Sequence, residues 1–254
     1  MSSQFDALPG TYDDFTTTPF RRFLETPSVL GAIGDLHGAS VLDLGCGSGA
    51  YTRLVRQQGA ARVTGMDVSP GMITHARARE TVEPLGVDYL LGGDLPDALA
   101  GAFDLVLGVY VLPYARNRAE LGRLCATAAR ALRPGGRFVT LPVHPGYRPG
   151  TVSYAPYGFQ LTAAAPPTDG SPVLLHLRFG GHDRAVTARY WSKSALEKAL
   201  SDTGFVEPRW TDPRVYEPGI AAHGSAYWHD YLAHPHTVIV DCRKSDCRKT
   251  ESGG

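Results

Sequence analysis

Apolar and polar positions follow two alternating spacings between residues 39 and 142. Short apolar runs rich in β-branched residues alternate with longer segments in which apolar positions recur every three or four residues. The apolar runs lie at 39–44, 61–68, 87–94, 103–112 and 137–143. Strands that alternate with helices predict a parallel sheet covered by helices on both faces. We therefore expect an α/β fold with a Rossmann-like core over residues 39–142.

Local signals mark where two of the intervening helices begin. Ser69 is expected to cap one helix, with Pro70 in its first turn, where a missing N–H costs nothing. Asn117 and Glu120 have the spacing of a capping box ahead of a later helix. These signals agree with the alternation and support the same fold.

The segments outside this core have different patterns. Residues 1–38 have helical spacing interrupted at Pro27, and we expect a helical cover there. Residues 143–190 are rich in proline, glycine and aromatic residues. The stretch 173–179 alternates between apolar and polar positions, and 185–191 is its expected partner strand, which predicts an inserted antiparallel lid. Residues 191–254 predict a helix, two further strands that bring the sheet to seven, and a polar tail.

The composition limits the class of protein. Lys and Arg total 25, as do Asp and Glu, so the net charge is zero and a basic nucleic-acid surface is not expected. No apolar run approaches the ~18 residues of a membrane span. The first residues lack the features of a secretory signal. The richness in Ala, Arg, Gly and Pro is typical of bacterial genomes of high GC content.

The cysteines, at positions 46, 125, 242 and 247, lack the spacing of a metal site. We expect free thiols in a reducing cytoplasm, with a pair between Cys242 and Cys247 left open. No metal-ligand cluster is expected elsewhere in the sequence.

The stretch "VLDLGCGSGA" (41–50) carries the chemistry of the core. An apolar strand leads through an acid into alternating glycines, and a helix begins whose unpaired N–H groups face the loop. Asp67 ends the next strand, at the place where a carboxylate binds ribose hydroxyls. Gly45, Gly47 and Ala50 also satisfy the dinucleotide pattern G-x-G-x-x-G/A, so this turn alone leaves two nucleotide classes open.

Longer stretches resemble one family. "VLDLGCGSG" resembles the first motif of class I S-adenosylmethionine (SAM) dependent methyltransferases. The stretches "VTGMDVSPGM", "LLGGDLPD", "FDLVLGVYVLPY" and "ALRPGGRFVTLPV" resemble the second to fifth motifs. The leading helical segment and the chain end resemble the small-molecule branch of that family. The resemblance implies SAM as the cofactor and a seven-stranded, mostly parallel Rossmann-like sheet.

The flanking chain disfavours a nicotinamide dehydrogenase. Residues 1–38 precede the first strand, whereas a nicotinamide-binding unit usually begins with that strand. Asp43 fits the methyltransferase motif and is not part of the dinucleotide pattern. An NAD-dependent oxidoreductase and a SAM-binding protein without turnover remain the alternatives.

The resemblance also assigns parts of the cofactor to residues of this chain. From the methionine end, these are Arg22 or its neighbour Arg21 for the carboxylate, Tyr12 over the sulfonium, Asp43, Gly45 and Gly47 along the methionine, Asp67 at the ribose, and Met72, Asp94 and Leu95 around the adenine.

Methyl transfer requires the protein to orient the reactants, exclude water and remove a proton. His144, which follows the fifth strand, is the first candidate for a base, and His229, near the chain end, is the second. Tyr12 is the candidate for contact with the reacting methyl group. Tyr110 and Tyr114 follow the fourth strand and also face the expected site. The aromatic residues of the inserted lid suit a planar acceptor.

The end of the fourth strand bears on the acceptor. It reads "GVYVLPY" (108–114) and lacks the Asn/Asp-Pro-Pro-aromatic quartet of many enzymes that methylate base amines or glutamine amides. Together with the neutral charge, this favours a small organic acceptor. We expect a nitrogen or carbon nucleophile of a heteroaromatic secondary metabolite, with O-methylation as the alternative. As partners we expect this small molecule, no nucleic acid and no membrane, with the chain acting as a monomer or homodimer.

Overall fold

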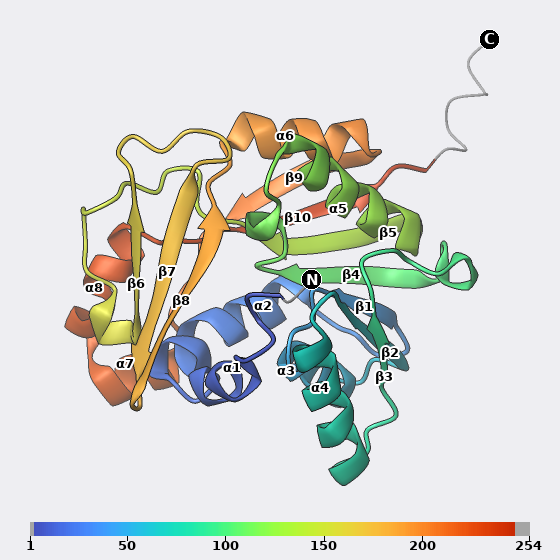
Figure 1. Cartoon of the computed structure of the whole chain (residues 1–254), viewed down its shortest axis with the longest axis horizontal. Coiled ribbons are helices and arrows are strands. Elements are labelled where there is room, and N and C mark those ends of the chain that lie inside the picture. Colours follow the sequence, from blue (N-terminus) through green and yellow to red (C-terminus); the bar gives the residue numbers. More distant parts are fainter. Residues whose placement is uncertain (1–2, 247–254) are drawn as a thin grey trace.

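The predicted strands form a seven-stranded sheet in the order β3-β2-β1-β4-β5-β10-β9 (Figure 1). The computed structural model describes residues 3–246. Strands β1 to β5 pair in parallel, and β10 runs antiparallel to both β5 and β9. The strands of this sheet are β1 (Ser40–Leu44), β2 (Arg62–Asp67), β3 (Asp88–Leu91), β4 (Phe103–Val109), β5 (Leu132–Leu141), β9 (Phe205–Thr211) and β10 (Ile239–Lys244). The expectation of a mostly parallel seven-stranded α/β sheet is confirmed.

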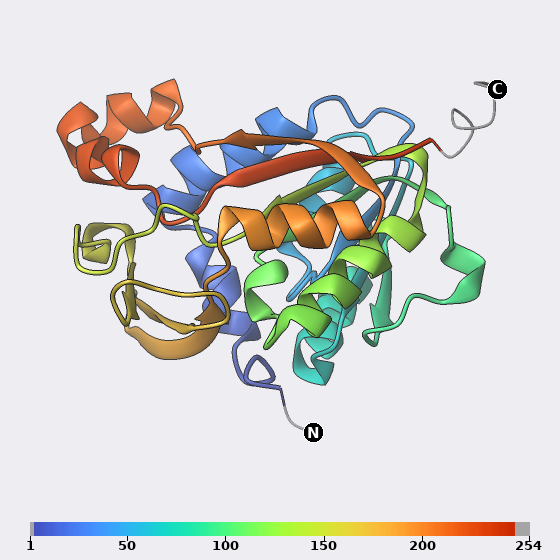
Figure 2. The same cartoon turned by 90° about the horizontal axis from the view of Figure 1, so that it is seen from above.

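Helices cover both faces of this sheet and enclose two apolar cores. The α-helices are α1 (Pro9–Phe15), α2 (Thr26–Ile33), α3 (Ala50–Gln57), α4 (Pro70–Val82), α5 (Arg118–Ala131), α6 (Lys193–Asp202), α7 (Glu217–His223) and α8 (Ser225–Ala233), with 3-10 turns at Asp97–Leu99, Leu112–Tyr114 and Ala155–Tyr157. In Figure 2 the green and orange helices α5 and α6 lie on one side of the red strand β10, and the blue helix α2 lies on the other.

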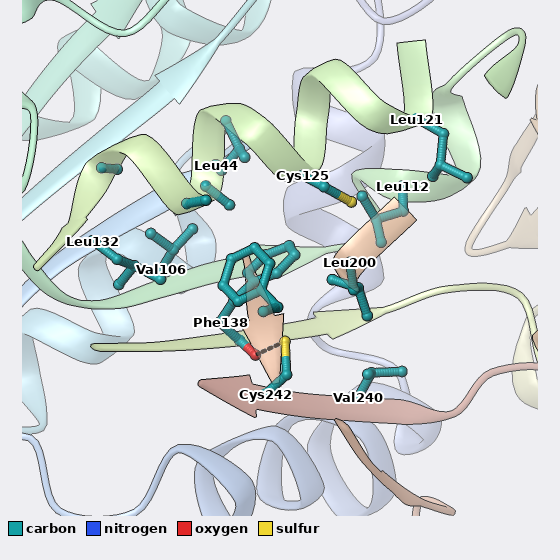
Figure 3. Packing of buried hydrophobic residues seen from close by; sticks show 14 of the residues in the cluster. Leu44, Val106, Leu112, Leu121, Cys125, Leu132, Phe138, Leu200, Val240 and Cys242 are labelled. Carbon is teal, nitrogen blue, oxygen red and sulfur yellow. Dashed lines mark hydrogen bonds between the residues drawn. The ribbon is translucent and has the colours of Figure 1, made fainter. Parts of the chain in front are cut away.

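The core under α5 and α6 contains Leu121 and Leu196 of those helices and Phe138 and Cys242 of the sheet. Figure 3 shows this core, including the Cys242 thiol, which donates to the Phe138 carbonyl oxygen at 3.7 Å. The second core lies under α2, α3 and α4. Because both faces of the sheet are buried, its strands read as apolar runs in the sequence rather than as alternating ones.

Two of the predicted helix caps are present. The Met72 N–H donates to the Ser69 hydroxyl at 3.3 Å, and the Glu120 N–H donates to the Asn117 side-chain oxygen at 2.9 Å. The reciprocal half of the capping box is absent, because the Glu120 carboxylate accepts the N–H of Arg116 instead.

Three cysteines in the described range, Cys46, Cys125 and Cys242, are buried free thiols. Cys247 lies outside the described residues, so a disulfide between Cys242 and Cys247 lies outside them as well. Between residues 3 and 246 no helix has the length and apolar character needed to cross a membrane.

Pro27 does not interrupt the leading helical segment, contrary to expectation. Residues Arg21–Glu25 form a π-helical turn that continues directly into α2. The Thr26 N–H donates to the Arg21 carbonyl, one residue further back than in an α-helix. We attribute the wider turn to Pro27, which has no N–H to donate to the preceding turn. The turn brings the side chains of Arg21 and Glu25 together inside the protein.

The inserted segment forms a second sheet of three antiparallel strands, β6 (Phe159–Ala163), β7 (Pro172–Phe179) and β8 (His182–Arg189). The sequence pattern predicted β7 and, displaced by a few residues, β8, but not the short strand β6. In Figure 1 this sheet stands beside the seven-stranded one, next to α1 and the C-terminal helices. One aromatic cluster, which includes Phe20, Phe159 and Tyr231, joins it to the N-terminal cover and α8.

The N-terminal residues lie across the start of α4. Leu8 packs with Met72, and the Ser69 hydroxyl donates to the Asp6 carboxylate at 2.6 Å. The Asp6 backbone passes so close to Gly71 that a Cβ there would overlap the Asp6 carbonyl oxygen. Glycine at position 71 therefore allows the cover to dock on α4.

This contact predicts opposite effects for two helical glycines. Gly71→Ala should destabilise the fold by about 1–3 kcal/mol, because the added methyl group displaces the Asp6 backbone. Gly122→Ala in α5 has no neighbour within 4 Å and is the matched control. It should gain about 0.5–1 kcal/mol from the better helix former. Urea unfolding of both variants measures the two signs, and a gain in both would show that the N-terminal residues do not dock there.

Candidate active site

A cavity of about 720 Å³ lies at the carboxyl ends of the parallel strands, where α/β sheets bind their ligands. Its near side consists of the loops that follow β1, β2, β3 and β4. Its far wall is apolar and combines the N-terminal cover with the inserted sheet, through Phe15, Phe20, Phe159, Leu161, Leu175, Leu177 and Ala188. The cavity is therefore shared by the core and by both added segments.

Backbone geometry shapes the glycine loop that follows β1. Gly49 has a φ of +85°, and a Cβ there would overlap the Tyr89 hydroxyl. The Gly47 N–H donates to one oxygen of Asp67 at 2.9 Å, and the Ser69 N–H donates to the other at 2.8 Å. Asp67 thus joins the glycine loop to the start of α4, and burial raises its pKa.

A second acid lies beneath the same loop. Asp43 is only 2% exposed, and the Thr52 hydroxyl donates to it at 2.7 Å. Burial raises the pKa of Asp43 to about 7, with the Thr52 hydrogen bond opposing the rise and the nearby Asp67 charge adding to it. A cation in the cavity would stabilise the charged forms of both carboxylates, whereas an anion would be repelled by them. This end of the cavity therefore fits the cationic SAM better than the pyrophosphate of NAD.

Two buried polar atoms at the cavity have no hydrogen-bond partner among the described residues. They are the Tyr12 hydroxyl and the Arg21 Nε, and both side chains line the cavity. Burial raises the pKa of Tyr12. Unpaired buried polar groups are costly, so these two atoms are suited to contact a ligand.

The structure brings eight of the predicted cofactor residues to this one cavity: Tyr12, Asp43, Gly45, Gly47, Asp67, Met72, Asp94 and Leu95. Arg22 is not among them, because it is exposed and its guanidinium lies over the Phe23 ring. The π-helical turn directs its neighbour Arg21 inward instead.

The two histidines predicted as bases do not border the cavity. His144 lines a separate small cavity of about 170 Å³, where its Nε2 lies 3.2 Å from Asp212, and His229 is exposed on α8. Val143 lines the main cavity and forms a β-bridge with Thr237. Adjacent residues of an extended chain face opposite sides, so His144 points away.

A buried carboxylate that sequence reasoning missed lies behind the cavity wall, in contact with the cavity-lining residues Arg21, Tyr51 and Tyr110. Glu25 is 1% exposed and forms an ion pair with Arg21. The Tyr51 hydroxyl donates to its Oε1 at 3.0 Å, and the Tyr110 hydroxyl donates to its Oε2 at 2.5 Å. Burial opposes the charge on Arg21, but Glu25 and the nearby hydroxyls of Tyr51 and Tyr110 together outweigh it and raise the pKa of the guanidinium. The four-residue spacing of Arg21 and Glu25 in a helical segment was the available sequence signal.

His236 extends this cluster and lines the cavity. Its Nε2 lies 3.3 Å from the Tyr110 hydroxyl, and its Nδ1 lies 3.1 Å from the Tyr231 hydroxyl. Burial lowers the pKa of His236 to about 3, so the imidazole is neutral at physiological pH. No local sequence pattern marks this histidine, because the return of the chain before β10 brings it to the site.

Tyr110 is placed by an unusual backbone conformation. It directly follows β4 and has a φ of +58°, in the left-handed region that non-glycine residues rarely adopt. Such a conformation costs about 1–3 kcal/mol and is concentrated at functional sites. Here it accompanies a tyrosine that lines the cavity and reaches both Glu25 and His236. Over residues 3–246 there is no group of three or more acids, histidines and cysteines arranged to hold a metal ion.

Comparison with known proteins agrees with this architecture. Residues 41–136 match the family described as "Methyltransferase domain". A demethylmenaquinone methyltransferase of Tropheryma whipplei is 43% identical over 107 residues, which are 42% of this chain and 43% of that protein. The match thus spans less than half of that curated relative.

Solved structures extend the likeness to nearly the whole chain. A SAM-dependent methyltransferase from Mesorhizobium loti has a TM-score of 0.63 at 22% identity, covering 90% of this chain and 99% of its own. The CcbJ methyltransferase from Streptomyces caelestis has a TM-score of 0.67 at 19% identity, covering 96% and 99%. The chain has the fold of class I SAM-dependent methyltransferases.

The placement of Asp67 predicts its effect on cofactor binding. Asp67→Ala should weaken SAM binding by about 1.5–3 kcal/mol, because the variant loses the charged acceptor that the sequence resemblance assigns to the ribose hydroxyls. Calorimetry measures the affinity, and Asp88→Ala, at the exposed start of β3, is the matched control that should bind normally. An unchanged affinity in Asp67→Ala would place the ribose elsewhere.

The raised pKa of Asp43 predicts how stability depends on pH. The folded pKa, about 7, lies above the ordinary value of 3.8, so the folded state binds this proton more tightly. The resulting stabilisation is complete below pH ~4 and is lost as the pH rises to ~7, at about 1.4 kcal/mol per pH unit.

Urea unfolding of the ligand-free protein at pH 4.5 and 7.5 tests this dependence against Asp43→Asn. The wild type should lose on the order of 3 kcal/mol relative to the variant between these two pH values. A constant difference between wild type and variant would show that Asp43 titrates normally.

Proposed function

We propose that this chain transfers the methyl group of SAM to a small organic acceptor, at a nitrogen or carbon atom of a heteroaromatic secondary metabolite, with a hydroxyl oxygen of such a molecule as the alternative. The observation that carries the proposal is one continuous cavity that runs from the acids of the glycine loop to an aromatic and aliphatic wall. Its volume is within the range of pockets that hold ligands of drug size. The name of the demethylmenaquinone methyltransferase relative also favours a small molecule as acceptor.

The residues at the acidic end, together with Arg21 of the N-terminal cover, have the donors and acceptors that the cofactor needs. We assign the ribose hydroxyls to Asp67, the adenine to Asp94 with Leu95 and Met72, and the carboxylate to Arg21 in place of Arg22. The charge of Asp43 favours the cationic part of the ligand. When bound, SAM supplies an electrophilic methyl carbon on a sulfonium, which is a good leaving group.

The other end of the cavity suits an uncharged acceptor. Phe20 and Phe159 lie with ring centroids 5.0 Å apart, and the inserted sheet adds aliphatic side chains to the wall. An apolar wall excludes water, which would otherwise compete for hydrogen bonds to the nucleophile and blur its alignment. The polar groups offered there include Tyr110 and the neutral His236.

Cofactor choice is tested by thermal unfolding. S-adenosylhomocysteine at 100 times its dissociation constant should stabilise the fold by about 2.7 kcal/mol. NAD at the same concentration should have no effect, because its pyrophosphate meets Asp43 and Asp67. Stabilisation by NAD and not by S-adenosylhomocysteine would overturn the cofactor assignment.

Turnover is tested by release of S-adenosylhomocysteine from SAM. We expect release with a pool of heteroaromatic hydroxyl and N–H compounds, and none with a matched pool of aliphatic amines and acids. Product mass spectrometry then identifies the methylated atom. Tight binding of SAM with no release from either pool would indicate a binding protein rather than an enzyme.

A further inference from the structure

The hydrogen bonds around Tyr110 have a definite direction. Glu25 is paired with Arg21, and a carboxylate accepts hydrogen bonds without donating, so Tyr110 gives it its single proton. His236 is neutral and carries one N–H. Because the Tyr110 proton points to Glu25, the Nε2 of His236 is the donor to the Tyr110 oxygen. Its Nδ1 then accepts the proton of Tyr231.

In the series of hydrogen bonds from Tyr231 through His236 and Tyr110, each donor therefore points its proton in the direction of Glu25. His236 has no free lone pair, since one ring nitrogen donates and the other already accepts. A phenolic oxygen accepts as well as donates, and Tyr110 lines the cavity. Tyr110 therefore offers its oxygen to a hydrogen-bond donor on the methyl acceptor, while its own proton is directed to the Glu25 carboxylate.

We propose that Tyr110 takes a proton from the acceptor while passing its hydroxyl proton to Glu25, and that the acceptor is a flat aromatic molecule with an acidic O–H or N–H group. This inference rests on the proposed methyl transfer and adds the route of the proton. Tyr110 is the catalytic residue, and His236 is a positioning residue that orients the Tyr110 oxygen.

The step is balanced in atoms and charge. The O–H or N–H bond of the acceptor breaks, and its proton forms a new bond to the Tyr110 oxygen. The Tyr110 proton moves to Glu25, and the freed electron pair of the acceptor bonds to the methyl carbon as the methyl–sulfur bond breaks. The methylated acceptor, S-adenosylhomocysteine and a protonated Glu25 result. When the products leave, Glu25 returns its proton to Tyr110, and the Tyr110 oxygen releases its own proton to water in the cavity.

Three features of the site support this route. The Tyr110–Glu25 distance of 2.5 Å is typical of a charge-assisted hydrogen bond, along which a proton moves readily. Burial raises the pKa of Tyr110, so the residue is protonated at rest and relays a proton rather than acting as a phenolate. The rings of Phe20 and Phe159 line the cavity and lie against His236, with centroids 5.6 and 4.7 Å from its ring, so the wall beside Tyr110 and His236 is aromatic and suits an aromatic acceptor.

The test uses 2-naphthol as a fluorescent probe, with and without S-adenosylhomocysteine. Its excited state is a strong acid that transfers its proton to a base within hydrogen-bonding distance and then emits at the longer wavelength of the naphtholate. In a dry cavity without a base it keeps its proton. We expect bound 2-naphthol to emit as naphtholate in the wild type, and the ratio of naphtholate to naphthol emission to fall at least about tenfold in Tyr110→Phe.

Variants separate the route from a structural effect. Tyr190→Phe is the matched control: it removes a buried hydroxyl outside the cavity that donates to the Pro145 carbonyl, and it should emit as the wild type does. Glu25→Gln should lose naphtholate emission. His236→Gln should retain it, because the amide N–H of glutamine takes the place of Nε2 as donor to Tyr110. Tyr110→Phe leaves the Arg21–Glu25 pair in place, so the test stands even where Glu25→Gln does not fold.

Three results would overturn the proposal. They are naphtholate emission that persists in Tyr110→Phe, emission that persists in Glu25→Gln, and failure of 2-naphthol to bind in calorimetry. The proposed function fails separately, through absence of S-adenosylhomocysteine binding and release, because the fluorescence measurement does not depend on turnover.

Discussion

The buried ion pair between Arg21 and Glu25 is the interaction on which the acceptor end of the cavity depends. Removing two charges from water costs several kcal/mol for each ion, and the cost is tolerated only when further hydrogen bonds satisfy the pair. Tyr51 and Tyr110 supply such bonds to the two oxygens of Glu25. The pair therefore requires α3 and the end of β4 to approach the N-terminal cover in one arrangement.

That requirement explains why three remote parts of the chain meet at this point. The π-helical turn contributes both charges, β4 ends in a residue with left-handed backbone, and the segment before β10 contributes His236. The aromatic cluster of the inserted sheet and α8 surrounds them. Because the surroundings are apolar, each hydrogen bond in the cluster is stronger than in water, and each missing partner would cost more.

The two ends of the cavity differ in electrostatic character. Asp43 and Asp67 lie near the glycine loop, where burial disfavours their charges and a cationic ligand would relieve them. At the other end the charges of Arg21 and Glu25 cancel, and His236 is neutral. A cation at one end and an uncharged acceptor at the other therefore match the cavity.

The sequence by itself determined the α/β sheet, the caps at Ser69 and Asn117, and the gathering of Asp43, Gly47 and Asp67 around one loop. Each of these follows from spacing within a few residues or from neighbouring strands whose carboxyl ends meet at one edge of a sheet. Local periodicity is a property of the amino-acid sequence, so it can be recognised without the tertiary structure.

Only the tertiary structure decided which polar residues reach the cavity. Tyr110 lies 85 positions from Glu25 and 126 from His236 in the sequence, and no local pattern around these residues predicts the contacts between them. The inward direction of Arg21 rather than Arg22 depends on the π-helical turn, and the outward direction of His144 depends on the bridge between Val143 and Thr237. Such directions are set by packing between distant segments, because a rotation of one residue in a turn or strand exchanges the buried side chain for the exposed one.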